Sequence, residues 1–200
     1  MMKTGQTEIH PLDPFLPEGA RILMLGSFPP KKERWSMEFF YPNFINDMWR
    51  ILGHIFFDDR NTFVAEDESG GKARRFDKDK CTSFAMEKGI AMYDTACEVR
   101  RLKDNASDKF LEVVEATDIE GLLTQIPDCR AIVTTGQKAT DIIVGTFGCE
   151  EPEVGAYRDF NIGGRPMRLW RMPSSSRAYP LPLEKKAEHY RKMFETENIL

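Results

Sequence analysis

Two stretches near opposite ends of the sequence decide the fold. In the first, Ile22-Leu23-Met24-Leu25 is followed by Gly26-Ser27-Phe28-Pro29-Pro30. In the second, Met167-Arg168-Leu169-Trp170 leads through Arg171 to Met172-Pro173-Ser174-Ser175-Ser176-Arg177. Each pattern is typical of a buried strand that ends in a turn rich in Gly, Pro or Ser. Because the carboxyl ends of parallel strands share one edge of an open α/β sheet, the two turns are expected to line one cleft.

Further apolar runs predict the other elements of a layered fold. Their alternation predicts a three-layer α/β/α sandwich with a central, mainly parallel four-stranded sheet. Strands are expected at 21–25, 89–94, 131–134 and 167–170. Helices are expected at 46–56, 119–126, 183–194 and from residue 136 onward. Loops are expected at 58–80 (flanking a short helix), at 100–103 and, as a loop or hairpin, at 150–165, and strand character is weak in 110–127.

The composition predicts one soluble domain over residues 1–200, with an extended arm at 1–20. A chain of 200 residues, 41% of them hydrophobic, suffices for one globular core. The apolar run 22–25 is too short to span a bilayer, and the first residues lack the pattern of a signal peptide, so a cytoplasmic protein without a membrane partner is expected. A formal net charge of −4 argues against nonselective coating of nucleic acid, although it permits a local basic rim.

The cysteines and histidines do not predict a metal centre. The cysteines lack the close pairs that zinc or iron–sulfur sites need, so reduced thiols and no metal or other cofactor are expected. His54 and His189 fall inside predicted helices, where packing or solvent exposure is the expected role. The cysteines are Cys81, Cys97, Cys129 and Cys149.

The two turns carry residues suited to a nucleic acid. Small hydroxyls and backbone N–H groups of Ser174, Ser175 and Ser176 can face a phosphate, and Arg177 can contact a phosphate or enter a base stack. Phe28 and the run Phe39-Phe40-Tyr41 provide aromatic faces for an extruded base. The same residues also fit a Ser-rich helix entry with a solvated arginine and an aromatic core. Charged side chains that fit a phosphate-gripping rim, or a merely solvated face, are Lys31, Lys32, Arg34, Lys72, Arg74 and Arg75.

The order of these segments resembles the uracil-DNA glycosylase superfamily over roughly residues 9–195. The resemblance rests on five segments: 25–29, 41–51, 89–94, 136–139 and 172–177. The first half is most similar to the hypoxanthine-DNA glycosylase branch, in which a Gly-Ser-x-Pro turn is followed by a segment ending in Asn-x-x-Trp-Arg-Ile. The final segment resembles thymine-DNA and mismatch-specific uracil-DNA glycosylases.

This resemblance implies hydrolysis of the bond between a deaminated or mismatched base and its deoxyribose in DNA. The base would be bound by the turn Gly26, Ser27 and Phe28 together with Tyr41. The turn Pro173, Ser174, Ser175, Ser176 and Arg177 would contact DNA and fill the space that the extruded base leaves. The implied enzyme acts as a monomer, without a cofactor or an obligate protein partner.

The catalytic residues are predicted less directly, because the motifs depart from those of the better-known branches. Phe28 stands where the mismatch-specific enzymes carry an Asn, the first turn lacks the Asp of the classical uracil enzymes, and the last motif lacks their His. An ungapped match to the hypoxanthine branch places the catalytic amide at Asn46, with Asn43 in reserve. Asn46 also fits the N-cap of the following helix. Asp94, at a strand end, fits a water ligand or a structural partner of Lys138 or a loop.

Three functional hypotheses follow from the sequence. The first is a monofunctional glycosylase that acts on uracil, hypoxanthine or a related base in base-excision repair. The second is a lesion- or DNA-binding protein of the same fold without turnover, which the apolar Phe28 suggests. The third is an unrelated α/β enzyme for a small phosphorylated metabolite, although neither common Gly-rich phosphate loop is present.

Overall fold

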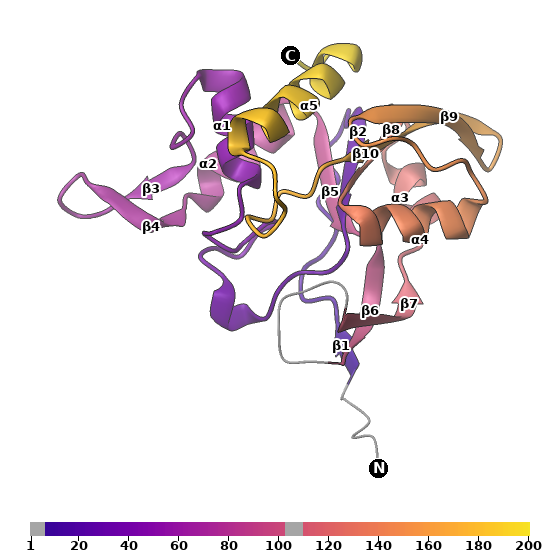
Figure 1. Cartoon of the computed structure of the whole chain (residues 1–200), viewed down its shortest axis with the longest axis horizontal. Coiled ribbons are helices and arrows are strands. Elements are labelled where there is room, and N and C mark those ends of the chain that lie inside the picture. The colour runs from indigo at the N-terminus through magenta and orange to yellow at the C-terminus, as the bar shows by residue number, and fades with distance from the viewer. Residues whose placement is uncertain (1–6, 103–109) are drawn as a thin grey trace.

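A five-stranded sheet forms the centre of the computed structural model, which describes residues 7–102 and 110–200 (Figure 1). The strand order is β5 (Ile90–Asp94), β2 (Ile22–Gly26), β8 (Ala131–Thr135), β10 (Arg165–Met172) and β9 (Ala156–Ile162). The first four strands are parallel, and β9 runs antiparallel to β10. The predicted mainly parallel sheet is confirmed. The predicted count of four strands is wrong, because β9 adds an edge strand through a hairpin at Gly163-Gly164, where both glycines adopt positive φ.

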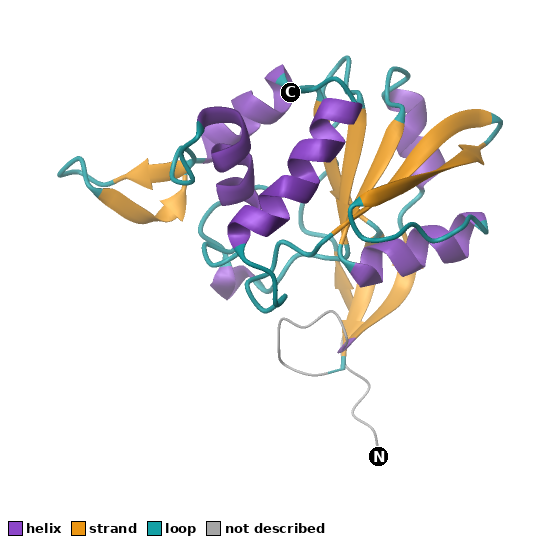
Figure 2. Cartoon of the chain, turned by 45° about the horizontal axis from the view of Figure 1, so that its top comes forward, coloured by secondary structure: helices purple, strands orange, loops and turns teal. Residues whose placement is uncertain are grey.

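Helices cover both faces of this sheet. Figures 1 and 2 show α1 (Met48–Phe57), α2 (Lys78–Glu87) and α5 (Leu183–Thr196) on one side, and α3 (Ile119–Gln125) and α4 (Gln137–Phe147) on the other. Every residue of β2 and β5 is buried, as strands between two helical layers must be. The predicted helices therefore all form, with ends shifted by a few residues.

Helices α1 and α5 pack against each other and join segments that are far apart in the sequence. The rings of Phe56 and Phe194 meet edge to face at 5.1 Å. Arg191 Nη2 also donates a hydrogen bond to the carbonyl of Ile55, at 3.1 Å. Helix α1 ends where Asp58 turns into the left-handed conformation, with φ of 54°. The pairing matters for function because the loop before α1 and the loop before α5 both carry predicted site residues.

A second, antiparallel sheet lies below the first and was not expected from the sequence. It has the order β1 (Thr7–Ile9), β6 (Ala96–Arg101) and β7 (Leu111–Ala116). The loop prediction for Arg100 and Arg101 is therefore wrong, since both residues lie in β6. Strand β7 lies within 110–127, where the sequence has only weak strand character. Lys103, the third residue of the predicted loop, lies outside the described residues. Register shifts in the β6–β7 pair break the alternation that would have revealed these strands.

The segment predicted as an exposed loop at 58–80 instead contains a hairpin. Strands β3 (Val64–Glu66) and β4 (Lys72–Phe76) pair antiparallel and project from the body of the protein (Figure 1). The hairpin is anchored by the buried Phe76, whose ring lies 5.1 Å from that of Phe44. The following helix α2 starts at an Asp77 side chain that accepts a hydrogen bond from the Lys80 N–H.

The N-terminal arm packs along the edge of the central sheet, as expected. Phe15 exchanges two backbone hydrogen bonds with Met92 of β5, at 3.0 and 2.9 Å. The described part of the arm thereby covers the edge of β5, which would otherwise expose unpaired backbone groups. None of the helices in the described segments has the length and apolar character needed to cross a membrane.

Candidate functional site

The carboxyl ends of the four parallel strands form one edge, at which Gly26, Asp94, Thr135 and Met172 end their strands. Gly26 and Asp94 are register partners. A Cβ at Gly26 would collide with Asp94 Oδ1 and would lie 3.9 Å from Thr135 Oγ1. Glycine is therefore required here so that the carboxylate can lie against the backbone of the neighbouring strand.

Asp94 is held by a histidine from the N-terminal arm. His10 Nε2 lies 2.8 Å from Asp94 Oδ2, and both side chains are buried. The His10 ring packs 4.5 Å from the Tyr93 ring and meets Phe28 edge to face at 5.2 Å. Among the described residues, no hydrogen bond reaches Asp94 Oδ1, so this oxygen remains an open acceptor. Of the two structural partners expected for Asp94, Lys138 or a loop, the structure shows the second: the partner is His10, from the irregular segment that follows β1.

Tyr41 supplies a neutral hydroxyl to the same edge. Its oxygen lies 3.1 Å from Thr135 Oγ1, and Thr135 Oγ1 donates its proton to the carbonyl of Leu25 at 3.3 Å. Either hydroxyl of this pair can be the donor; when Thr135 donates its single proton to Leu25, Tyr41 donates to Thr135. Burial raises the pKa of Tyr41 well above its usual value, and the hydroxyl stays protonated. The backbone of Tyr41 adopts a positive φ of 52°, which marks a constrained turn.

The two candidate catalytic amides lie in the loop that follows Tyr41. Asn46 Oδ1 accepts a hydrogen bond from the Met48 N–H at 2.9 Å, and Asn43 Oδ1 accepts one from the Ile45 N–H at 3.2 Å. Asp47, not Asn46, is the N-cap residue of α1, so the simple N-cap assignment is wrong although Asn46 does satisfy a first-turn donor. Across the described segments, neither Asn43 nor Asn46 donates a hydrogen bond through Nδ2. Asn46 can therefore support the helix start and still offer its amide protons.

The serine-rich turn leaves β10 and is braced from within. The Ser174 hydroxyl accepts a hydrogen bond from the Ser176 N–H, and the Ser176 hydroxyl accepts one from the Ala178 N–H, both at 3.2 Å. Tyr190 of α5 donates to the carbonyl of Pro173 at 2.9 Å. Two of the three serines thus shape the loop into α5, which agrees with the helix-entry interpretation and holds the turn in one conformation.

The serine-rich turn and the Asn46 loop are joined directly. The Asp47 N–H donates to the carbonyl of Ser175 at 2.9 Å, and Arg177 Nε donates to Asp47 Oδ1 at 2.9 Å. Lys186 Nζ lies 3.4 Å from Asp47 Oδ2. The structure therefore brings together two predicted groups of site residues, one before α1 and one after β10.

Phe28 takes a different place from the other site residues. Its side chain is 8% exposed and packs with Ala96 and Val99 of β6 and Leu111 of β7. The guanidinium of Arg101 lies 5.7 Å from its ring centre. Phe39 and Phe40 are buried in the main core, so for these two rings the core interpretation applies.

A search of solved structures finds the same fold in a candidate uracil DNA glycosylase from Methanosarcina acetivorans, determined by solution NMR. The match has a TM-score of 0.57 and 22% sequence identity, and it covers 91% of this chain and 97% of that chain. The chain has a uracil-DNA-glycosylase-like fold. No family model matches the sequence, and a search of curated proteins finds no match.

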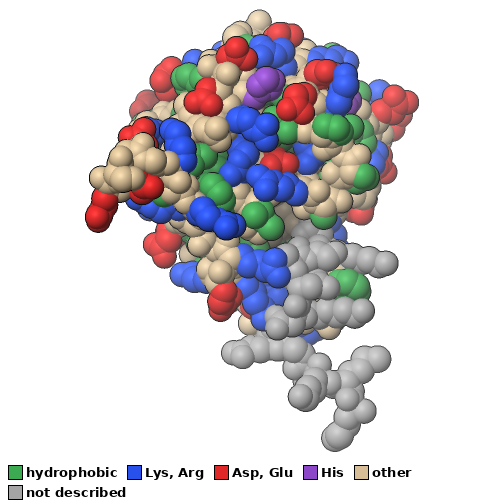
Figure 3. Space-filling model, turned by 60° about the vertical axis from the view of Figure 1, so that its left-hand side comes forward, with side chains coloured by type: hydrophobic (Ala, Val, Ile, Leu, Met, Phe, Trp, Pro, Cys, Tyr) green, Lys and Arg blue, Asp and Glu red, His purple; other side chains and the backbone are tan. Residues whose placement is uncertain are grey.

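Within this glycosylase-like fold, basic side chains gather on one face. Figure 3 shows Lys and Arg side chains spread across the middle of the face that carries the projecting hairpin. The two predicted basic segments adjoin, because the Phe76 N–H of β4 lies 3.4 Å from the Ser36 hydroxyl, just after the short 3-10 helix Lys32–Arg34. Some of the charge is neutralised locally: Lys32 lies 4.0 Å from Glu38, and Lys72 lies 3.8 Å from Glu66.

The four cysteines of the described residues are free, and burial raises the pKa of each thiol. Burial raises the pKa of Cys129 to about 12 and also raises the pKa of Cys81, so both thiols stay protonated at neutral pH. Residues 7–102 and 110–200 contain no group of three His, Cys, Asp or Glu side chains placed to hold a metal ion.

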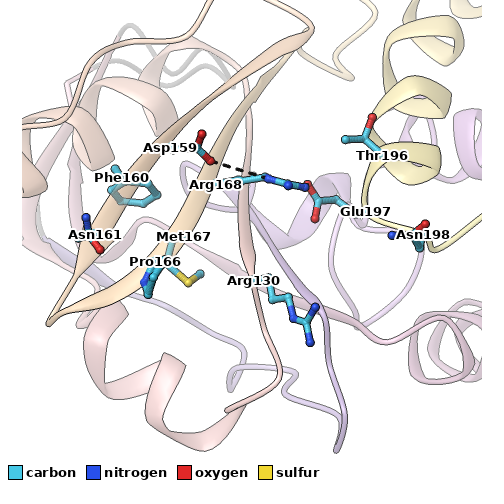
Figure 4. Close-up of a pocket in the computed structure, with 10 residues that line it drawn as sticks. All are labelled: Arg130, Asp159, Phe160, Asn161, Pro166, Met167, Arg168, Thr196, Glu197 and Asn198. Carbon is cyan, nitrogen blue, oxygen red and sulfur yellow. Dashed lines mark hydrogen bonds and ion pairs between the residues drawn. The ribbon is translucent and has the colours of Figure 1, made fainter.

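A pocket of about 520 Å³ lies at the opposite edge of the sheet (Figure 4). It is bounded by the start of β8, the β9–β10 hairpin and the end of α5, and it contains none of the predicted site residues. Arg168 spans it between Asp159 at 3.9 Å and Glu197 at 3.2 Å. Its lining residues are Arg130, Asp159, Phe160, Asn161, Pro166, Met167, Arg168, Thr196, Glu197 and Asn198.

Sequence reasoning missed four residues that shape the site: His10, Asp47, Thr135 and Lys186. Thr135 directly follows the predicted strand 131–134, and Asp47 directly follows the predicted site residue Asn46. Both could have been found by considering one more residue. His10 and Lys186 gave no local sequence signal, because their partners are distant in the chain. His10 contacts Asp94, 84 residues away, and Lys186 contacts Asp47, 139 residues away.

Proposed function

We propose that the chain is a monofunctional DNA glycosylase that removes a deaminated or mismatched base, such as uracil or hypoxanthine, in base-excision repair. One observation carries the proposal: a buried aspartate with one open carboxylate oxygen stands at the sheet edge that also carries the Gly26 and Pro173–Arg177 turns. Cytoplasmic location and action as a monomer without an obligate partner belong to the same proposal.

The reaction breaks the bond between C1′ of deoxyribose and the base nitrogen. The bonding electrons leave with the base, a water oxygen adds to C1′, and a proton from that water ends on the departing base. Asp94 Oδ1 can accept a hydrogen bond from the attacking water and orient it. A neutral amide cannot remove a proton, but the Asn46 Nδ2 can donate to the base as negative charge develops on it. Backbone N–H groups of Ser27 and Phe28 are the corresponding donors in the first turn.

Deamination converts the ring nitrogen of cytosine (N3) or adenine (N1) from an acceptor into an N–H donor. An acceptor placed at this nitrogen attracts the donor and repels the lone pair of the normal base. This acceptor must be a group other than Asp94 Oδ1, which holds the attacking water. Extrusion of the nucleotide from the helix, which this reaction requires, also costs least for a mispaired base.

The experiment is a panel of duplex oligonucleotides that carry uracil, hypoxanthine, xanthine or thymine opposite each normal base, followed by alkaline cleavage at abasic sites. We expect strand cleavage for at least one deaminated base and none for undamaged duplex. Asp94→Asn should lower the rate by about 100-fold or more, which is the usual size of a lost general acid–base or electrostatic contribution. Lack of cleavage across the whole panel would reject the enzymatic proposal.

A DNA-binding protein without turnover is the second candidate, and Phe28 favours it. An apolar ring occupies the position at which the mismatch-specific uracil-DNA glycosylases carry an Asn, and it is packed against residues of β6 and β7. Such a protein would retain lesion-containing duplex in a gel-shift assay, with strong salt dependence, and would release no base.

A further inference from the structure

We propose that Asp47 and Lys186 are positioning residues that hold Arg177 in the orientation to bind a DNA phosphate and tie that contact to the Asn46 loop. The inference rests on the proposed function, because it assumes that the partner is a DNA strand. It assigns Arg177 to the sugar–phosphate backbone and not to the base stack.

Asp47 is the centre of a buried polar cluster. Its two carboxylate oxygens receive Arg177 Nε at 2.9 Å and Lys186 Nζ at 3.4 Å, and its backbone N–H donates to the carbonyl of Ser175. Lys186 Nζ also donates to the carbonyl of Ser176 at 2.8 Å. A lysine whose side chain is only 1% exposed is unusual and needs such partners, so the cluster is a built feature of the fold.

Arg177 is anchored on one side and open on the other. Its Nε is committed to Asp47, while within the described segments its two terminal nitrogens donate to no protein group. The Arg177 side chain is 48% exposed, in contrast to the buried Asp47 and Lys186. An arginine held through Nε presents a planar pair of N–H donors in a fixed direction, which suits a phosphate diester. Insertion into the base stack would require Arg177 to leave Asp47.

The charges around Asp47 leave a positive surplus for an anion. Asp47 is one carboxylate facing three cations: Arg177, Lys186 and the neighbouring Arg50. Burial, followed by the positive charge of Arg177, lowers the pKa of Arg50 to about 10, so Arg50 is still charged at neutral pH. The next cation, Arg60, is 4.0 Å from Glu184. A phosphate that approaches Arg177 would therefore meet uncompensated positive charge.

The same cluster fixes the backbone next to the candidate catalytic amide. Arg50 Nη1 donates to the carbonyls of Phe44 at 2.7 Å and Asn46 at 3.2 Å. Its guanidinium lies between two rings, 4.4 Å from the centre of Phe44 and 5.0 Å from that of Phe76. Asp47 follows Asn46 directly, so a phosphate held by Arg177 would be placed at a set distance from the Asn46 amide.

The test measures binding of a duplex that carries a tetrahydrofuran abasic analogue, over a range of salt concentrations, by fluorescence anisotropy. Arg177→Gln should weaken binding at least tenfold at low salt and reduce the slope of log K against log salt by about one, the contribution of one phosphate contact. Arg177→Lys should lose most of the affinity as well, since lysine keeps the charge but not the anchored fork. Arg168→Gln, which removes a similarly exposed, carboxylate-paired arginine at the opposite edge, should leave the slope unchanged.

A double-mutant cycle separates positioning from general stability. Lys186→Met and Asp47→Asn should each reduce the salt slope when Arg177 is present and should have no further effect on the slope in the Arg177→Gln background. Melting temperatures measured in parallel account for any loss of folding, and a purely structural role would change the melting temperature but leave the slope of the folded fraction intact.

The inference is overturned if Arg177→Gln binds with the wild-type slope, if Arg177→Lys binds with the wild-type affinity, or if wild-type protein fails to bind the duplex at low salt. The same experiments test the phosphate contact of Arg177 and the proposed glycosylase activity separately. If the variants change the salt slope as predicted but the wild-type protein releases no base, the glycosylase proposal is rejected and the phosphate contact is kept. If the wild-type protein releases base but Arg177→Gln has the wild-type slope, the phosphate contact is rejected and the glycosylase proposal is kept.

Discussion

His10 and Asp94, which lie 84 residues apart in the sequence, form a buried pair in which Nε2 is 2.8 Å from Oδ2. The histidine comes from the N-terminal arm and the aspartate from the end of β5. His10 Nδ1 lies 2.9 Å from the carbonyl and 3.2 Å from the N–H of Leu12, so it has a partner whether or not it carries a proton. The arm therefore fixes the aspartate on which the proposed chemistry depends.

His10→Ala should destabilise the protein and reduce base release. Loss of the imidazole leaves a buried carboxylate oxygen without its hydrogen bond, which costs about 1–3 kcal/mol of unfolding free energy. Urea denaturation measures the effect. His54→Ala, which removes a half-buried histidine of α1, serves as the control and should change the unfolding free energy by less than His10→Ala. An equal loss in the two variants would contradict the assigned role of His10.

Gly26→Ala should displace Asp94 and abolish base release. The new methyl group would overlap Asp94 Oδ1, and the carboxylate cannot retreat without breaking its contact with His10. Gly145→Ala is the matched control: it lies in α4, has no atom within 4 Å of the added Cβ, and should stabilise the protein by about 0.5–1 kcal/mol. Melting curves and base-release rates of both variants provide the comparison. A fully active Gly26→Ala enzyme would show that Asp94 does not need this position.

Asn46→Asp should separate the structural from the proposed catalytic role of Asn46. The carboxylate keeps an oxygen for the Met48 N–H, so stability should be retained, while the amide donor is lost and base release should fall by about 100-fold or more. Asn46→Ala should lose both the oxygen that accepts from the Met48 N–H and the amide donor, and its unfolding free energy should fall by about 0.5–2 kcal/mol. Parallel unfolding and single-turnover measurements make the distinction. Unchanged activity in Asn46→Asp would move the role of donor to the base to Asn43 or to the backbone N–H groups of the first turn.

Alkaline pH should destabilise the fold through the buried thiol of Cys129. Burial raises its pKa from 9.0 to about 12, so above pH 9 the unfolded chain loses this proton while the folded chain keeps it. The unfolded state then binds fewer protons, and stability falls with rising pH by about 1.4 kcal/mol per pH unit for this group. Urea denaturation between pH 8.5 and 10.5 should give a shallower decline for Cys129→Ala than for the wild type. Identical slopes would show that Cys129 is not responsible.

The apolar runs at β2, β5, β8 and β10 were sufficient to predict the core of the fold. The runs of β2, β5 and β8 are continuous because these strands are buried on both faces, whereas β10 carries Arg168 and Arg171 at half-buried positions. Strands β6 and β7 escaped prediction because they lie in the small second sheet, where polar residues are admitted and bulges interrupt the alternation. Strand β9 was expected only as part of a loop or hairpin at 150–165, and the hairpin alternative is the one that the structure shows.

The candidate site could be predicted only where it follows the strand ends. Gly26, Asp94 and the Ser174–Arg177 turn belong to recognisable strand–turn patterns. Asp47 and Lys186 become a pair only through the packing of α1 on α5, and the burial of a lysine has no signature in its own helix. His10 reaches Asp94 through the path of the arm along β5, which no local pattern specifies.

The most direct test of the account is detection of free base, by mass spectrometry, after incubation of duplexes that contain uracil or hypoxanthine with wild-type protein and with Asp94→Asn. We predict that the wild-type protein releases one of these bases intact. Asp94→Asn should still fold and still bind the duplex, but its rate of base release should be lower by about 100-fold or more. Wild-type protein that binds both duplexes but releases neither base, or an Asp94→Asn variant as active as the wild type, would contradict the account.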